Sequence, residues 1–472
     1  MPGVQQGDDQ DSGPDWTAPT AQRAVSARLE LPGSKSITNR ALILAALAQA
    51  PTRIGRPLRA RDTELMAGAI GALGATVAPS VTPEGDPRGD GWLVTPGWRD
   101  DATTVDVGNA GTVIRFVPPV AALARADVAF RGDPRAAQRP VGPLLAALEA
   151  LGARIDDDGR RAVPFTVRGQ GRMPGGTVTL DASGSSQLVS GLLLAAARYD
   201  KGAEIRHAGP RVPSAPHIAM TVAMLRAAGA DVETGPPSVN PSVNPSGNPS
   251  GNPSGNPFGN PFGNDVWRVH PGALSPGAID IEPDLSNAGP FLAAAVATGG
   301  EVTFAGWPEA GLQASAQILD VVTGMGATAQ ATGDGMRVAG SGAIHGITAD
   351  LGDISEVAPP LVALAALADS PSTFTGIGHM RTHECDRLAA LVSEIGKFGG
   401  DVTELPDGLH IRPRPLRSDG ASFDSHDDHR LVMAAAVLGL AVPGVLIRNA
   451  ATVAKTFPSF RDLWGQMLEQ RL

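Results

Sequence analysis

The chain has 472 residues, enough for two to four domains, and 42% of them are hydrophobic against 18% charged, so most of the chain is globular. A net charge of −10 and an aromatic content of only 4% argue against a general DNA- or RNA-binding protein. The single cysteine, Cys385, excludes an internal disulfide framework and a zinc site built from cysteines, and it fits a reducing compartment.

The beginning of the chain predicts neither export nor membrane anchoring. The first 25 residues are polar and acidic and lack the apolar region of a secretory signal, so we expect a disordered start and a cytoplasmic protein. The longest charge-free apolar stretch, Leu431–Ile447, is interrupted by Pro443 and Gly444 and is too short to span a membrane. We predict a buried helix followed by a strand for this stretch.

A repeated pattern organises the chain into similar segments. Apolar helical stretches end in a glycine, and a mostly β-branched residue follows three positions later; the glycines are Gly74, Gly152, Gly229, Gly326 and Gly399. Glycine is the usual left-handed residue that stops a helix, so each is expected to precede a strand. A period of about 75 residues is too long for a solenoid repeat of 20–50 residues. It predicts an α/β protein built from several copies of one subdomain.

One interval of this pattern contains a low-complexity insert. Residues 237–264 form seven tetrads of the type Pro-x-x-Asn. A proline at every fourth position excludes both helix and strand pairing, so we predict a disordered insert in a surface loop. A tolerated expansion of the loop is the simpler interpretation, and an interaction element is the alternative.

Three segments in the first part of the chain could bind anions. In the first, a Pro-Gly turn leads through Ser34, Lys35 and Ser36 into a strong helix, with Arg40 one turn further on. In the second, Gly108 and Gly111 permit close approach to the backbone at a helix start. The third offers arginines in a proline-bounded loop, which suits bidentate binding of carboxylate or phosphate; they are Arg135 and Arg139. An N-cap, a tight turn and solvated arginines are the respective alternatives.

Two further helix starts carry hydroxyl groups. Ser185, Ser186 and Gln187 precede an apolar helix, and Ser214 opens another helix with His217. Consecutive hydroxyls and free N–H groups suit an anion, although simple capping would look the same.

The second half places carboxylates and cations together. Glu356 precedes a very apolar helix, so we expect a partly desolvated carboxyl with a raised pKa, suited to acid–base catalysis. A first-turn glutamate that complements the helix dipole is the alternative. Further on, a helix with apolar residues at helical spacing is predicted over Arg387–Phe398. His383, Glu384 and Arg387 can share one face of its start.

The last two candidates lie near the C-terminus. Ser425–Arg430 begins a helix, and its neighbouring acidic and histidine side chains leave a metal site open; they are His426, Asp427, Asp428 and His429. Lys455 follows in the segment VAKTFP. At least five helix starts therefore carry Ser, Lys, Arg or His on an acidic chain. Such an arrangement favours a phosphorylated and carboxylated small molecule as substrate.

Taken in order, the motifs GSKSxTNR, GNAGTxxR, QRP, SSQ, HExDR, DDHR and AKTFP resemble the 5-enolpyruvylshikimate-3-phosphate (EPSP) synthase family, over nearly the whole chain apart from the insert. The sibling family, the UDP-N-acetylglucosamine enolpyruvyl transferases, is less similar. It has Lys-Asn in place of Lys35-Ser36 and a reactive cysteine in a mobile loop, whereas Cys385 lies at a helix start.

The resemblance implies an α/β, two-domain enolpyruvyl transferase fold, in which each domain comprises three βαβαββ units arranged as an inside-out α/β barrel. Residues 1–33 would form the N-terminus and the first strand of domain I, 34–283 domain II with the insert 237–264, and 284–472 the rest of domain I. The implied reaction transfers the enolpyruvyl group of phosphoenolpyruvate to the 5-hydroxyl of shikimate 3-phosphate and releases phosphate. A monomer without metal or cofactor is expected, with the two domains closing over the site to exclude water.

The resemblance also assigns roles. Shikimate 3-phosphate would be held by Lys35, Ser36, Arg40, Ser185, Ser186, Gln187, Ser214, Glu356 and His383. Phosphoenolpyruvate would be held by Lys35, Gly111, Arg139, Gln187, Arg387, Arg430 and Lys455. Glu356 would take the proton of the 5-hydroxyl, and Glu384 would deliver or remove the methylene proton. Lys35 and Lys455 would stabilise the departing phosphate.

Several positions depart from the family pattern. Glu356 stands where aspartate is common, His383 where lysine is common, and Phe116 where proline is frequent. His379 and His217 replace asparagine and tyrosine. We expect His383 to make substrate contacts depend on pH between about 6 and 7. Two other hypotheses stay open: a metal-dependent hydrolase using His426 to His429, and a non-catalytic scaffold that binds partners through the insert.

Overall fold

The computed structural model describes residues 14–81, 90–235, 265–333 and 335–470. Contacts divide the chain into two compact units. Unit 1 comprises residues 1–30, Ser286–Gly306 and Ala316–Leu472, and unit 2 comprises Leu31–Leu285 and Trp307–Ser315. Trp307–Ser315, expected in the other domain, belongs to unit 2, where the backbone N–H of Leu312 donates to Glu282 Oε1 at 2.9 Å.

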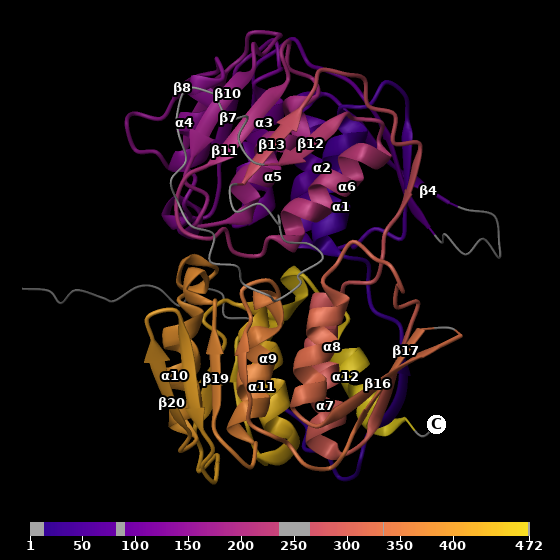
Figure 1. Ribbon diagram of the computed structural model, residues 1–472, viewed down its shortest axis with the longest axis vertical. Coiled ribbons are helices and arrows are strands. Elements are labelled where there is room, and N and C mark those ends of the chain that lie inside the picture. Colours follow the sequence, from indigo (N-terminus) through magenta and orange to yellow (C-terminus); the bar gives the residue numbers. More distant parts are fainter. Residues whose placement is uncertain (1–13, 82–89, 236–264, 334, 471–472) are drawn as a thin grey trace, which may run out of the picture. The chain divides into compact units, whose positions relative to one another are not determined.

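Two repeats of unit 2 have the order βαβαββ (Figure 1). The first comprises β6 (Thr103–Asp106), α3 (Gly111–Ala121), β7 (Val128–Arg131), α4 (Gly142–Ala150), β8 (Arg154–Asp156) and β9 (Phe165–Arg168). The second comprises β10 (Gly176–Leu180), α5 (Ser186–Ala196), β11 (Ala203–His207), α6 (Pro216–Ala227), β12 (Val232–Gly235) and β13 (Val266–Val269). In both sheets the first two strands are parallel and the last strand lies between the second and the third.

The third sheet of unit 2 takes its first strand from a distant part of the chain. The strands of this sheet are β14 (Ala278–Asp280), β3 (Thr52–Gly55), β5 (Gly91–Thr95) and β4 (Thr76–Ser80). The helices of the same repeat are α1 (Lys35–Ala46) and α2 (Arg61–Leu73). β14 pairs in parallel with β3. Gly33 and Pro283 form an antiparallel bridge beside this sheet. Position 33 requires glycine, because a Cβ there would lie 2.3 Å from the carbonyl oxygen of Arg56.

Unit 1 repeats the same order twice. Its first sheet contains β2 (Ser26–Leu29), α7 (Gly289–Thr298), β15 (Glu301–Ala305), α8 (Ser315–Gly324), β16 (Ala327–Thr332) and β17 (Gly335–Gly340). Its second contains β18 (Thr348–Asp350), α9 (Ala358–Ala366), β19 (Ser372–Thr375), α10 (Arg387–Lys397), β20 (Asp401–Leu405) and β21 (Gly408–Arg412).

The last sheet of unit 1 differs from the expected βαβαββ unit. It contains β22 (Ser422–Asp424), α11 (His429–Ala441), β23 (Leu446–Arg448) and α12 (Phe460–Glu469). Its third strand is β1 (Trp16–Thr17), which pairs antiparallel with β23. β1 thus takes the position beside the second strand that the final strand of the repeat occupies in the other sheets.

The prediction of a disordered start is therefore wrong from Pro14 onward. The backbone N–H of Ala18 donates to Val445 O at 2.9 Å, and its side chain is buried against α11. A Cβ at Gly439 on α11 would lie 2.4 Å from the Cβ of Ala18. The ring of Trp16 meets Phe460 edge to face, with centroids 6.2 Å apart. Residues 1–13 lie outside the described part of the chain.

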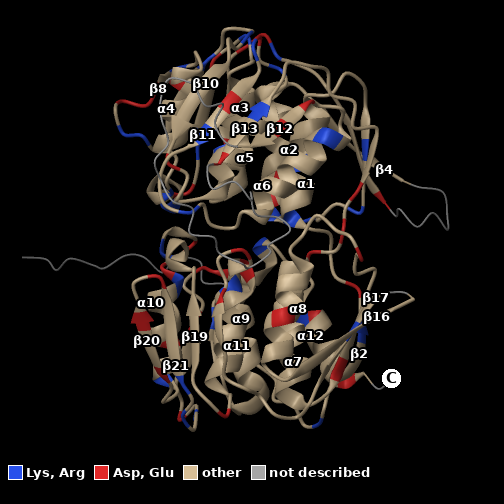
Figure 2. Cartoon of the chain, viewed as in Figure 1, with Lys and Arg blue, Asp and Glu red and all other residues tan. Residues whose placement is uncertain are grey.

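The core of each unit lies among central helices. All residues of α3 are buried, and α3 packs against α5 in unit 2. In unit 1, α11 is buried from His429 to Leu440 and packs against α7 and α9. A helix that is apolar all round must be buried. Accordingly, α7 and α9 contain no Lys, Arg, Asp or Glu, and α7 is drawn in tan in Figure 2.

The predicted two-domain α/β fold, built from repeated βαβαββ units, is confirmed in its main features. Each of the five repeat glycines has a positive φ, between 85° and 117°, and is followed by a strand: β4, β8, β12, β16 and β20. Leu431–Ile447 forms most of α11 and the start of β23, as predicted. Within the described residues, the helices fall short of what crossing a membrane requires in length and apolar character. The insert 237–264 lies outside the described residues.

Candidate active site

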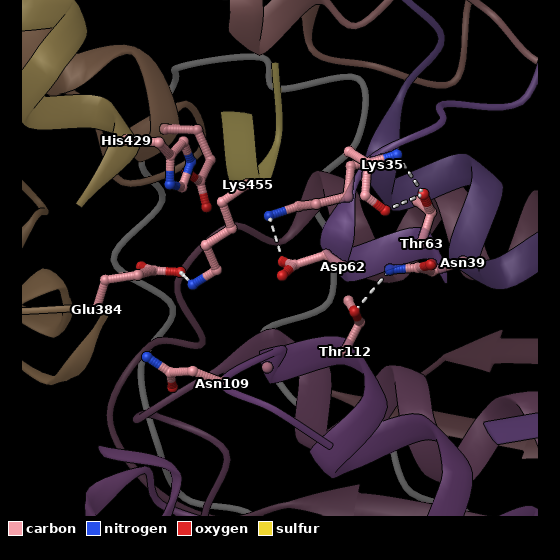
Figure 3. A network of polar contacts seen from close by, with 12 residues as sticks. Lys35, Asn39, Asp62, Thr63, Asn109, Thr112, Glu384, His429 and Lys455 are labelled. Carbon is pink, nitrogen blue, oxygen red and sulfur yellow. Dashed lines mark hydrogen bonds and ion pairs between the residues drawn. The ribbon is translucent and has the colours of Figure 1, made fainter. Parts of the chain in front are cut away.

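In unit 2 the start of α1 presents a lysine beside a buried carboxylate. Ser34 caps the helix by accepting the N–H of Ile37 at 3.5 Å. The Lys35 side chain is 20% exposed, and its Nζ lies 3.5 Å from Oδ2 of Asp62, whose side chain is 3% exposed (Figure 3). Oδ1 of Asp62 is buried and makes no hydrogen bond within the described residues. The lysine is thus held by one carboxylate oxygen and remains accessible.

The start of α3 brings two buried arginines close to a glycine. Arg139 donates from Nη1 to Asn109 O at 2.9 Å, and Arg115 donates from Nη1 to Gln187 Oε1 at 2.8 Å. A Cβ at Gly111 would lie 2.8 Å from Arg139 Nη2 and 3.0 Å from Arg115 Nη1. A side chain at position 111 would therefore displace the ends of these two arginines. Arg135, the other candidate in this loop, bonds instead to the exposed side chain of Gln138.

The start of α5 is tied to α3 through Gln187. Ser185 caps α5 by accepting the N–H of Gln187 at 3.2 Å, and Ser186 is buried. Ser214, before α6, has a φ of 52°, and its carbonyl accepts the N–H of His217 at 3.0 Å.

Arg40 links three helices of unit 2. Its Nε donates to Thr221 at 2.7 Å, its Nη1 to the carbonyl of Ser36, and its Nη2 to Ser190 and the carbonyl of His217. Burial lowers the pKa of this guanidinium to about 9. A guanidinium has five N–H donors, and these contacts within the described part of the chain engage four of them.

A direct bond also joins α1 to α3. Asn39 Nδ2 donates to Thr112 Oγ1 at 2.7 Å, and both side chains are buried (Figure 3). The N-terminal ends of α1, α3 and α5 are therefore connected by side-chain bonds. Free N–H groups, hydroxyls and cations at these ends can bind an anion.

In unit 1, Arg387 is the centre of a charged cluster. Asp428 accepts from its Nε at 2.7 Å and from its Nη2 at 3.1 Å, and Glu384 Oε2 lies 3.0 Å from Nη2. Its Nη1 lies 3.5 Å from Glu356 Oε2. The guanidinium is buried, which acts to lower its pKa, but these carboxylates outweigh burial and raise it. Arg387 is therefore permanently charged.

Glu356 lies between two cations. Arg430 Nε lies 3.6 Å from Glu356 Oε2, the oxygen that Arg387 also approaches. Arg430 is itself held by Ser286, to whose carbonyl its Nη1 donates at 2.8 Å. The Glu356 side chain is 29% exposed, and both cations favour its charged form, which is the form of a general base. These cations oppose the desolvation expected from the apolar helix.

Lys455 ends the 3₁₀ turn η5 (Ala450–Lys455) and approaches the same cluster. Its Nζ lies 3.4 Å from Glu384 Oε1, and neither side chain exceeds 8% exposure (Figure 3). Glu384 therefore touches one cation with each carboxylate oxygen.

Comparison with known proteins decides the family. The model of the family "EPSP synthase (3-phosphoshikimate 1-carboxyvinyltransferase)" matches residues 19–253 and 261–464. The chain belongs to the EPSP synthase family. A 3-phosphoshikimate 1-carboxyvinyltransferase of Kocuria rhizophila is 44% identical over 459 residues, which are 96% of each chain. The predicted family resemblance is thereby confirmed.

Solved structures support the same fold. EPSP synthase of Acinetobacter baumannii superposes with a TM-score of 0.72 at 23% identity, covering 96% of this chain and 97% of that chain. The enolpyruvyl transferase NikO of Streptomyces tendae gives a TM-score of 0.68 at 16% identity, covering 95% and 96%.

The pH-sensitive role predicted for His383 in this family member is wrong. Its Nδ1 accepts from Arg387 Nη1 at 3.0 Å, which requires the neutral imidazole. Burial first, and then Arg387, lower the pKa of His383 well below its usual range. The neighbouring His379, whose Nε2 lies 3.1 Å from Ser355 Oγ, also has a pKa lowered mainly by burial.

The side chains considered for a metal site bind different residues. Asp428 binds Arg387, whereas His426 Nε2 lies 2.8 Å from Glu394 Oε1. Within the described residues, His, Cys, Asp and Glu form no group of three that could hold a metal ion. Together with the family assignment, this removes the grounds for the hydrolase hypothesis. Cys385 lies 3.7 Å from Asp428 Oδ2, and burial raises the pKa of its thiol, so it is a poor nucleophile.

The structure brings the predicted residues together in two sets, one in each unit. Sequence reasoning missed two residues of these sets, Asp62 and Arg115, and also the ion pair between Asp428 and Arg387. Asp62 lies in the first turn of α2, where acidic residues are common, and Arg115 stood in a quoted motif but received no role. Only tertiary contacts distinguish these residues from ordinary caps and surface charges.

Proposed function

We propose that this protein transfers the enolpyruvyl group of phosphoenolpyruvate to the 5-hydroxyl of shikimate 3-phosphate, releasing phosphate and forming 5-enolpyruvylshikimate 3-phosphate. The observation that supports this most strongly is the 44% identity to a curated enzyme of that name over 96% of both chains. The cationic helix starts of unit 2 and the carboxylate–arginine cluster of unit 1 suit two substrates that are both anionic.

Shikimate 3-phosphate takes its main contacts from unit 2 in this proposal. The hydroxyls and amides at helix starts bind its phosphate, and the guanidinium of Arg40 contributes one bond. The residues are Lys35, Ser36, Arg40, Ser185, Ser186, Gln187 and Ser214, with Glu356 and His383 from unit 1. A neutral His383 acts as a hydrogen-bonding partner and not as a charge.

Phosphoenolpyruvate is bound by arginines and lysines. In this proposal phosphoenolpyruvate meets Arg139 beside Gly111, where the absence of a side chain leaves room for the guanidinium. Gln187, which accepts a hydrogen bond from Arg115, contributes a further contact. The remaining contacts come from Lys35, Arg387, Arg430 and Lys455. A planar guanidinium suits a carboxylate, and an ammonium suits a phosphate oxygen.

Glu356 begins the reaction as the general base. Held in its charged form by Arg387 and Arg430, it takes the proton of the 5-hydroxyl while that oxygen forms a bond to the enol ether carbon of phosphoenolpyruvate. The neighbouring methylene carbon gains a proton and becomes a methyl group. The product of this step is a tetrahedral adduct that still carries the phosphate.

Glu384 delivers the methylene proton in the first step and removes it in the second. Without substrates it is bound to Lys455 and Arg387, which keep it ionised. The anionic substrates compete for these cations, so their binding favours the protonated carboxyl that can deliver the proton. In the second step the Glu384 carboxylate takes a proton back from the methyl group as the carbon–oxygen bond to phosphate breaks, which forms the enol ether and releases phosphate. Lys35 and Lys455 stabilise the phosphate as its charge grows.

The proposal includes the setting of the reaction. We place the enzyme in the cytoplasm, as a monomer, in the biosynthesis of chorismate and aromatic amino acids. The single cysteine fits that compartment. Light scattering of the purified chain should give the mass of one copy, and twice that mass would contradict the monomer.

The test is a phosphate-release assay on the purified chain. We expect release from phosphoenolpyruvate only when shikimate 3-phosphate is present, and none when UDP-N-acetylglucosamine is the acceptor. Absence of release with shikimate 3-phosphate would overturn the proposal. Equal release without any acceptor would indicate a phosphatase instead.

A further inference from the structure

The loop between β22 and α11 has an unusual backbone. In the segment Asp424–Asp428, His426 and Asp427 have φ values of 48° and 57°. Left-handed conformations cost free energy in residues other than glycine, and two in succession persist only where their surroundings fix them. The contacts that fix this loop are therefore informative.

The main contact comes from Glu394 on α10. Its side chain is only 1% exposed, yet it carries a carboxylate. Oε1 lies 2.8 Å from His426 Nε2, and Oε2 accepts the backbone N–H of Asp424 at 2.8 Å and contacts Lys397 Nζ at 2.5 Å. A buried carboxylate is costly compared with an apolar residue of similar volume, so its presence here suggests a specific task.

The other end of the same loop, Asp428, binds Arg387, the centre of the charged cluster in unit 1. Asp428 caps α11 by accepting the N–H of Arg430 at 2.8 Å, and it binds Arg387 through both carboxylate oxygens. Arg387 and Glu394 lie seven residues apart on α10, which is two helical turns. Residues of α10 therefore contact both ends of the loop. Because Asp428 binds the Arg387 guanidinium through both oxygens, its position sets the direction of that guanidinium.

We propose that Glu394 and His426 are positioning residues that fix the loop Asp424–Asp428, so that Asp428 presents Arg387 and Arg430 to phosphoenolpyruvate. This inference rests on the proposed function. Glu394 and His426 act through Asp428, and we assign neither of them a contact with substrate. Their effect should therefore fall on the binding of the substrate that the two arginines hold.

A second set of contacts also holds this loop. Asn449 Nδ2 donates to Asp427 Oδ1 at 2.5 Å, and Ser425 Oγ donates to Asn449 O at 3.2 Å. The outer side of the loop borders an open cavity of about 720 Å³, lined in part by Asp424, Asp427 and Lys397. The His426 side chain is 36% exposed, so its substitution leaves little empty space in the core.

The test compares His426→Ala and His426→Gln with the wild-type chain. His345→Gln is the matched control, because His345 forms an exposed pair with Asp369 at 2.9 Å in the same unit. We expect His426→Ala to raise the KM for phosphoenolpyruvate about tenfold, the effect of losing one hydrogen bond to a charged group, with a much smaller change in the KM for shikimate 3-phosphate. The amide N–H of His426→Gln can still donate to Glu394 and should restore most of the affinity.

Hydrogen exchange of the Asp424–Asp428 amides is measured on the same variants, because it requires no turnover. Faster exchange in His426→Ala and near-normal exchange in His426→Gln are expected, with the control unchanged. An unchanged KM in His426→Ala, an equal rise for both substrates, or failure of His426→Gln to rescue would overturn the inference. If the wild-type chain itself released no phosphate, the proposed function would fail, and exchange unaltered in His426→Ala would then separately refute the positioning role.

Discussion

Lys35, at the start of α1 in unit 2, has a role that a single substitution can test. Its ammonium has one buried carboxylate neighbour, Asp62, and its side chain stays partly exposed. We predict that Lys35→Ala lowers kcat by about 10²-fold or more, because a cation at the departing phosphate stabilises the transition state more than the ground state. Steady-state kinetics and a melting curve check this.

The matched control is Lys201→Ala, which removes an exposed lysine from the same unit. It should leave kcat and the melting temperature unchanged. Turnover of Lys35→Ala within about fivefold of the wild-type value would be too small a loss for the role assigned to it.

Gly111 tests the arginine pair in a different way. A methyl group there would lie 2.8 Å from Arg139 and 3.0 Å from Arg115, and both contacts are with the ends of side chains that can shift. Gly111→Ala should therefore fold and should raise the KM for phosphoenolpyruvate about tenfold, since a displaced guanidinium loses a charge-assisted bond. The KM for each substrate is the measurement.

Gly68→Ala on α2 serves as the control, since a Cβ there meets nothing within 4 Å. It should increase the free energy of unfolding by roughly 0.5–1 kcal/mol and leave the KM values alone. Equal kinetic effects of the two substitutions would show that the arginine contacts are irrelevant.

At the scale of elements, the loop before α11 should make stability depend on pH. The hydrogen bond that His426 donates to Glu394 raises the pKa of this histidine. For Glu394, burial acts to raise the pKa, but the bonds from His426 and Lys397 outweigh it and the pKa is lowered. The histidine therefore stabilises the fold fully below its unfolded pKa of about 6.5 and loses this effect as pH rises through the higher folded value.

We predict that the wild-type chain is more stable than His426→Gln at pH 6 and that the difference shrinks by pH 9. Because His426 is about a third exposed, the change should amount to a few tenths of a kcal/mol. Urea unfolding at both pH values measures it. A difference that grew toward pH 9 would have the wrong sign.

The elements also show what local sequence can predict. The helix ends at the repeat glycines and the helix over Arg387–Phe398 could be predicted, because both depend on residues close together in the sequence. β1 was not, because two residues show no periodicity and pair with a strand more than 400 positions away. His383 was placed correctly on the face of Arg387, but its neutrality depends on burial and on the direction of one hydrogen bond.

At the scale of the whole molecule, removal of the insert 237–264 distinguishes the enzyme hypothesis from the scaffold hypothesis. Gly235 and Val266 are paired across β12 and β13, so a two-residue turn can join them. Replacing residues 236–265 by Asn-Gly should leave kcat and KM near normal. Stability should rise by at most about 2 kcal/mol, because a shorter loop costs less entropy. Lost turnover in a folded variant would give the insert a functional role.

The most direct test of the transferase mechanism is an NMR spectrum of the reaction in D₂O, with phosphoenolpyruvate and shikimate 3-phosphate as substrates. We predict that an enol ether and inorganic phosphate appear in equal amounts, with deuterium in the methylene group, because that carbon passes through a methyl group that gains one solvent hydron and loses one. Phosphate without enol ether, or enol ether free of deuterium, would contradict the account.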